Sequence, residues 1–203
     1  MKTLLIATVI AVLSGPAFAD DMQIEVDKAL ALGKSFAIVD GLKVLANRGN
    51  LKASYQLGIL YRDGTHVRKD PAMARDFLKV AADDDYIRLK YKDGLMEAQY
   101  ALGVMERDGI GGKVDLDDAA DWFDDAAQQG YAPAQLALAE LYLKGGGVDR
   151  DYERAYMWAS IAAEQLSGDE KRKADGILTS AQKGLAPANL DKAKKLASEW
   201  KPR

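Results

Sequence analysis

Carboxylates are the most concentrated reactive groups in this sequence of 203 residues. Between residues 115 and 125 there are six aspartates, which are Asp115, Asp117, Asp118, Asp121, Asp124 and Asp125. Clustered carboxylates can transfer protons or bind a cation, but a calcium loop needs a glycine and a later glutamate in an order that is absent here. On a helix, four of them would share one outward face: Asp117, Asp121, Asp124 and Asp125. The pattern favours a solvated acidic face; the functional reading is a docking face for a basic partner, and paired catalytic carboxylates are the weakest reading.

Other reactive groups are scarce. The sequence has no cysteine, which excludes disulfides, thiolate metal sites and a cysteine nucleophile. Its one histidine, His66, falls in a turn, where a side chain that tolerates the turn's backbone angle is favoured over a catalytic role. No nucleophile-elbow, zinc-protease or phosphate-loop motif is present. The sequence therefore predicts a protein that is not an enzyme and has no cofactor or metal.

Three related stretches must position these groups. They begin at Ala53, Ala98 and Ala134 and read "ASYQLGILYRDG", "AQYALGVMERDG" and "AQLALAELYLKG". Apolar residues recur at i, i+4 and i+7, which is one face of a helix. Each stretch ends in a glycine suited to closing a helix, and a later aspartate suited to capping the next one. These residues are Gly64, Gly109 and Gly145, then Asp70, Asp115 and Asp151.

Each unit is thus predicted to be a helix, a turn and a second helix. A single helical pair cannot bury both apolar faces, whereas stacked pairs cover one another. Gly58, Gly103 and Ala139 occupy the same position in the three first helices, where a second helix must approach closely. Because alanine stands there in the third unit, the pattern predicts that Gly103→Ala is mild or stabilising and that Gly103→Leu overpacks the position and costs about 1–3 kcal/mol.

The stretch "AQYALGVMERDGIGG" followed by "AADWFDDAAQQGYAPAQ" resembles a Sel1-like repeat, a relative of the tetratricopeptide repeat. The resemblance implies an all-α fold, an α-solenoid of helix-turn-helix repeats with a C-terminal helical cap. It also implies an adaptor or scaffold for other proteins, of the secreted or periplasmic bacterial type. Many secreted members carry cysteine pairs, which this chain lacks.

In such a solenoid the first helices line the inner surface. The residues that would lie there are Tyr55 and Arg62 in the first unit, Tyr100 and Arg107 in the second, and Leu136, Glu140 and Leu143 in the third. Tyrosine and arginine often anchor interfaces. Packing between units is the favoured interpretation for the tyrosines, and contact with a ligand's carboxylate or backbone for the arginines.

The chain is expected to divide into a cleaved signal peptide (1–19), a divergent N-terminal helical hairpin (20–52), three repeats (53–97 with an insertion at 83–97, 98–133 and 134–166) and C-terminal capping helices (167–203). Residues 1–19 have a basic start, a short apolar run and small residues before a cleavage point between Ala19 and Asp20. We expect export to the periplasm or beyond, with no membrane insertion after cleavage. The net charge of −3 gives no general attraction to nucleic acid.

The leading hypothesis is a non-enzymatic envelope scaffold that binds protein or peptide partners through its solenoid. The alternative is a binder of cell-wall fragments or an accessory protein of a cell-envelope hydrolase.

Overall fold

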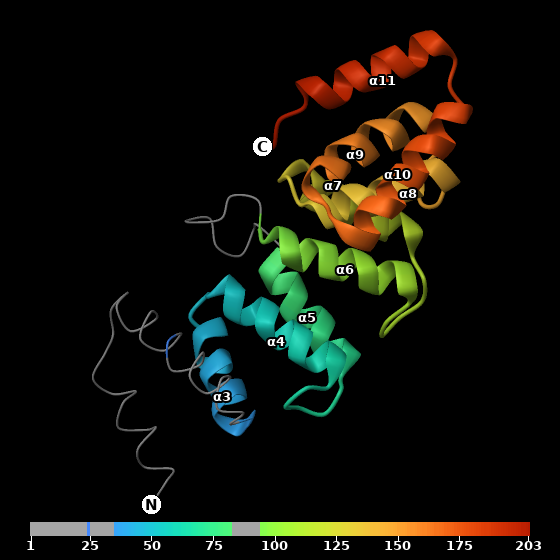
Figure 1. The fold of residues 1–203 in the computed structure, drawn as a ribbon. Coiled ribbons are helices and arrows are strands. Elements are labelled where there is room, and N and C mark those ends of the chain that lie inside the picture. Colours follow the sequence, from blue (N-terminus) through green and yellow to red (C-terminus); the bar gives the residue numbers. More distant parts are fainter. Residues whose placement is uncertain (1–23, 25–34, 83–93) are drawn as a thin grey trace, which may run out of the picture. The chain divides into compact units, whose positions relative to one another are not determined.

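The computed structural model describes residues 24, 35–82 and 94–203. Within these residues every regular element is an α-helix, as predicted (Figure 1). The predicted signal peptide with its Ala19–Asp20 cleavage point, the turn expected at Gly33 and residues 83–93 of the insertion lie outside the described residues. None of the described helices is long and apolar enough to cross a membrane. The chain divides into two compact units, residues 1–80 and 81–203.

The first compact unit contains α3 (Ser35–Ala46), α4 (Leu51–Asp63) and most of α5 (Pro71–Ala82). The last two residues of α5 belong to the second compact unit. Helix α3 packs against α4. Their shared core consists of Ile38, Val39, Leu42, Leu45, Ala46, Ala53 and Leu57. The turn at Gly49 has φ of 82°, and Gly130 in the corresponding turn of the second unit has φ of 94°, so the half-repeat before Ala53 is folded like a later one.

The second unit contains six helices among its described residues. They are α6 (Met96–Asp108), α7 (Leu116–Gln128), α8 (Ala132–Lys144), α9 (Tyr152–Gln165), α10 (Gly168–Lys183) and α11 (Pro187–Glu199). Helices α6 and α7 form one antiparallel hairpin and α8 and α9 the next, and α7 packs on α8 (Figure 1). One continuous core of small and large apolar residues runs from Ala119 to Ala181.

The three inter-helix turns repeat the same hydrogen bonds. Each first helix ends at a glycine in the left-handed conformation, and each second helix is capped by the predicted aspartate side chain. The backbone N–H of that aspartate also donates to a carbonyl near the end of the first helix, at 2.9 Å in all three units; the pairs are Asp70–Tyr61, Asp115–Glu106 and Asp151–Tyr142. The turn therefore holds the two helices of each hairpin in one fixed orientation.

Close approach between the helices of a hairpin explains the glycines inside α4 and α6. A Cβ atom on Gly58 would lie 2.5 Å from Leu78, and one on Gly103 would lie 2.6 Å from the ring of Phe123. In the third hairpin the same register places buried Ala139 opposite buried Ala159. Each pair thus joins a glycine to a large side chain, or two alanines.

Buried glutamines link successive hairpins. Gln135 is fully buried; its amide donates to the carbonyl of Ala127 at 3.2 Å and accepts from Gln165 at 3.4 Å. Gln99 makes the equivalent bonds to Ala82 and from Gln129, at 3.3 and 2.8 Å. In each case the second partner lies 30 residues further along the chain. The same position in the first repeat is Ser54, whose hydroxyl is buried and has no hydrogen-bond partner among the described residues.

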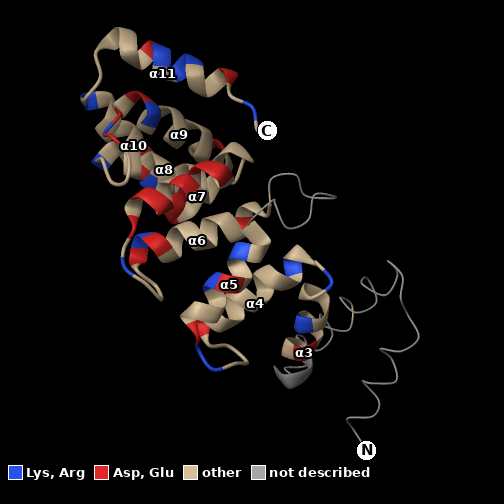
Figure 2. Cartoon of the chain, turned by 180° about the vertical axis from the view of Figure 1, so that it is seen from behind, with Lys and Arg blue, Asp and Glu red and all other residues tan. Residues whose placement is uncertain are grey.

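The last two helices of the given sequence do not form a hairpin with each other. Helix α10 packs on α9 and α8, and α11 packs on α9 rather than on α10. Ala174, Ile177 and Ala181 of α10 are buried, whereas Ala193 is the single buried residue of α11. Helix α11 carries both basic and acidic residues (Figure 2).

We predict that Gly103→Ala destabilises the protein, contrary to what the sequence comparison with Ala139 suggests. The added methyl meets Phe123, whereas Ala139 faces an alanine, so overpacking costs about 1–3 kcal/mol. Phe123→Ala alone should cost about 3–5 kcal/mol. The double variant recreates the alanine pair, and in urea unfolding its loss should be smaller than the sum of the two single losses. Strict additivity would contradict the contact.

We predict that Gln135→Met lowers the free energy of unfolding by about 1–2 kcal/mol, because it removes two buried hydrogen bonds while keeping the side-chain volume. Ser54→Ala is the matched control. It should change stability by less than about 0.5 kcal/mol or increase it, because its hydroxyl makes no bond to lose. Thermal or urea unfolding of both variants measures the difference; equal losses would show that the glutamine bonds contribute nothing.

Candidate functional site

The first helices of the second unit line a groove of about 560 Å³ that crosses α6, α8 and α10. Its lining is partly apolar and partly charged. The apolar part is Tyr100, Pro133, Leu136, Ala137, Leu143 and Ile177, and the charged part is Arg107, Glu140, Lys144, Glu170 and Lys173. Surfaces that bind protein segments combine apolar and polar side chains in this way.

Two ion pairs order the charged side chains of the groove. Arg107 donates two parallel hydrogen bonds to Asp108, at 2.7 and 2.9 Å. Lys144 pairs with Glu140 one turn away on the same helix. The bond to Arg107 lowers the pKa of Asp108, and the bond to Asp108 together with the nearby charge of Glu140 raises the pKa of Arg107. Arg107 thus stays charged, and it must share or exchange its carboxylate to bind a ligand.

Tyr100 combines packing with exposure to the groove. Its ring lies 5.6 Å from that of Phe123 and 5.4 Å from that of Tyr131, measured between centroids. The packing role predicted for this tyrosine is therefore present. The ring is half-buried and also lines the groove.

The equivalent residues of the first repeat, Tyr55 and Arg62, lie in a different setting. Tyr55 lines a small apolar pocket of about 210 Å³ with Leu42, Gln56, Ile59 and Leu60. Arg62 forms with Asp63 the same two hydrogen bonds that Arg107 forms with Asp108, at 2.7 and 3.1 Å. Its guanidinium lowers the pKa of Asp63. The structure therefore brings together Tyr100 and Arg107 of the predicted residues, and leaves Tyr55 outside that groove.

The predicted acidic face is present on α7. Asp117, Asp121 and Asp125 are exposed, and Asp124 is half-buried (Figure 2). Asp124 accepts a hydrogen bond from Gln128 at 3.3 Å and lies 4.0 Å from Arg203. Among the described residues, no group of three or more carboxylates or histidines is arranged to hold a metal ion.

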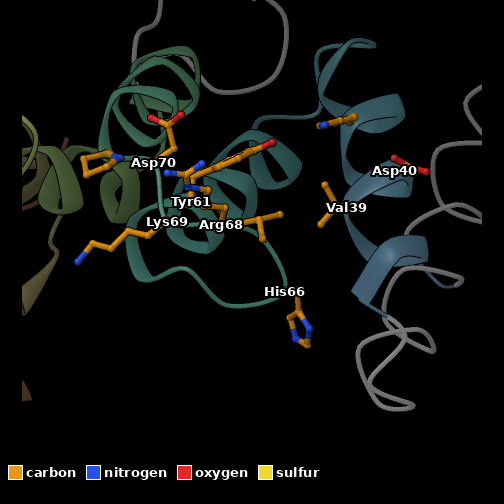
Figure 3. Close-up of a pocket in the computed structure, with 10 residues that line it drawn as sticks. Val39, Asp40, Tyr61, His66, Arg68, Lys69 and Asp70 are labelled. Atoms are coloured by element: carbon orange, nitrogen blue, oxygen red, sulfur yellow. The ribbon is translucent and has the colours of Figure 1, made fainter.

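His66 is a turn residue with a left-handed backbone, as predicted. Its φ of 64° matches those of Gly111 (76°) and Gly147 (72°) in the other two turns. A pocket of about 570 Å³ lies beside it between α3 and the α4–α5 loop. In Figure 3 the imidazole of His66 and the ammonium of Lys69 point away from the other labelled side chains of this pocket.

The repeat pattern of the sequence makes Leu136, Glu140 and Leu143 of the third repeat the equivalents of the inner-surface residues of the second repeat. The structure places all three in the groove. The same pattern missed Lys173 and Ile177 because α10 was assigned to a terminal cap. The signal for them was the apolar periodicity of α10, which makes it a first helix by position, packed beside α8.

The fold defines a class of protein, an array of helical hairpins, and the first helices α6, α8 and α10 line a groove. The Sel1 repeat model matches residues 51–86, 97–131 and 132–165, which is more than half of the chain. The chain therefore belongs to the Sel1 repeat family.

Relatives and solved structures agree with this assignment. An uncharacterized protein of Neisseria meningitidis serogroup B is 30% identical over 145 residues, covering 68% of this chain. The alginate biosynthesis protein AlgK of Azotobacter vinelandii is 32% identical over 149 residues, covering 71% of this chain. The chain spans 28% of the length of each of these relatives. The crystal structure of a Sel1 repeat protein from Oxalobacter formigenes superposes with a TM-score of 0.56 at 30% identity, over 66% of this chain and 95% of that one.

Proposed function

We propose that this protein is a non-enzymatic scaffold of the bacterial cell envelope that binds extended protein segments in the groove across α6, α8 and α10. The observation that carries the proposal is the groove itself, whose lining combines apolar side chains with charged side chains held in ion pairs. Membership of a repeat family built for stacking supports it, because such arrays present extended binding surfaces. The name of the Azotobacter relative suggests a setting beside exopolysaccharide production.

The groove fits a peptide better than a small substrate. Leu136, Ala137 and Ile177 contribute apolar surface to the groove, which suits the apolar side chains of a bound segment. Glu140 and Lys173 also line it, where they can pair with charges of either sign. Interface charges of this kind set orientation and association rate more than affinity.

We predict that a photo-cross-linking amino acid at Lys173 captures envelope proteins in living cells, while one at Lys194 does not. Both lysines are exposed, but Lys173 lines the groove and Lys194 lies on α11 outside it. Leu143→Glu should weaken the captured complex about tenfold or more, because an apolar anchor is lost. Equal capture at both sites, or capture of glycan fragments in place of protein at Lys173, would contradict a peptide groove.

We predict that the protein recovered from outside the cytoplasm begins at Asp20. This prediction rests on the basic start, the apolar run and the small residues of the segment 1–19. Mass spectrometry of the N-terminal peptide tests this. Exported protein that retains residues 1–19 would contradict cleavage, and retention in the cytoplasm would contradict an envelope role.

A further inference from the structure

Helix α7 has no basic residue in its last turn. Asp124 lies in the last five residues of the helix and adds a negative charge there. The unsatisfied carbonyls at a helix C-terminus already make that end negative, so aspartates there are unfavourable and a cation is favoured. Such a cation must come from another segment.

The segment 200–203, "WKPR", supplies it. The backbone N–H of Arg203 donates to the carbonyl of Gln128, the last residue of α7, at 2.9 Å. The guanidinium of Arg203 lies 4.0 Å from the carboxylate of Asp124. Arg154 of α9 also acts on Asp124 through space, but its own guanidinium is hydrogen-bonded to the Tyr142 hydroxyl at 3.0 Å.

Two apolar contacts also hold the segment 200–203. The rings of Trp200 and Trp158 meet edge to face, with centroids 5.7 Å apart. Pro202 lies against Gly130, where an added Cβ would be 3.4 Å from its side chain. Gly130 also has φ of 94°, which disfavours a larger residue there. Together these groups recognise an aromatic residue, a proline and an arginine in an extended segment.

The segment is held loosely. In α11, which carries it, only Ala193 is buried. The indole N–H of Trp200 is buried and has no hydrogen-bond partner among the described residues, which opposes docking. The Arg203–Asp124 pair is long, and both side chains are about half exposed, which makes it a weak attraction.

We propose that the end of α7, with Gly130 and Trp158, is a second binding site, which takes a basic, extended segment of a partner protein with an aromatic residue, a proline and an arginine spaced as in 200–203. The chain's own segment is an internal pseudo-ligand that a partner displaces. This site lies apart from the groove across α6, α8 and α10, so the proposal goes beyond the proposed function and does not depend on it.

The test measures binding of a fluorescent synthetic peptide of residues 187–203 to the full chain by anisotropy. Trp200→Ser with Arg203→Glu disables the internal segment. We expect this chain to bind the peptide about tenfold or more tightly than the wild type, because the site is no longer occupied. The control peptide carries the same two substitutions and should not bind.

A charge reversal separates recognition from misfolding. Adding Asp124→Arg to the disabled chain should abolish binding of the native peptide and restore binding of a peptide with Arg203→Glu alone. Circular dichroism and thermal melting confirm that each variant is folded. Binding that is equal for native and control peptides, or unaffected by Asp124→Arg, overturns the proposal. Concentration-dependent dimers of the wild type, lost on disabling the segment, would also overturn it in favour of exchange between two copies of this chain.

Discussion

The thickness of each helical hairpin is the constraint on which this structure depends. Where the two helices cross, the chain pairs glycine with leucine, glycine with phenylalanine, and alanine with alanine, at the same offset in three successive units. The sum of the two side chains is limited, because protein interiors have little free volume. A hairpin that is too thick could not present the same face to its neighbour as the others do. The effect of a substitution at one of these two positions therefore depends on which residue stands at the facing position.

A second constraint acts between hairpins and is polar. Gln99 and Gln135 each bond a carbonyl of the preceding second helix and the side chain of a later glutamine. Apolar contacts allow small sliding between helices, whereas a buried amide with two partners tolerates little, since an unpaired buried polar group is costly. Within the second compact unit, the bonds of Gln135 hold α8 in register with α7 before it and α9 after it. The groove is a consequence, because it needs α6, α8 and α10 side by side with Tyr100, Leu136 and Ile177 on the same surface.

Local signals in the sequence were enough to predict the helices and their ends. Asp115 caps α7 and Gly109 closes α6 because both effects act within one turn of chain, and the same holds for the backbone of His66. The expectation that Gly103→Ala is mild was wrong because it compared positions along the first helices and ignored the residue opposite each of them. That residue is Phe123 for Gly103 but an alanine, Ala159, for Ala139. The packing of α11 on α9 was also not predictable, since an amphipathic pattern shows that a helix has a buried face but not which helix covers it. The groove was predicted in part, from the repeated positions of Tyr100 and Arg107.

The end of the array shows how a regular repeat can generate a distinct surface. The C-terminal end of α7 runs into α8, and the backbone bonds of Gly130 and Tyr131 satisfy two of its carbonyls. Helix α7 has that turn and in addition receives Arg203 from a helix that crosses α9 in place of pairing with α10. The aspartates near the end of α7 oppose the helix dipole, and the basic segment compensates for them. A charge that is unfavourable within its own helix, and is balanced by a segment with few buried contacts, is the kind of interaction that a competing segment can replace at small cost.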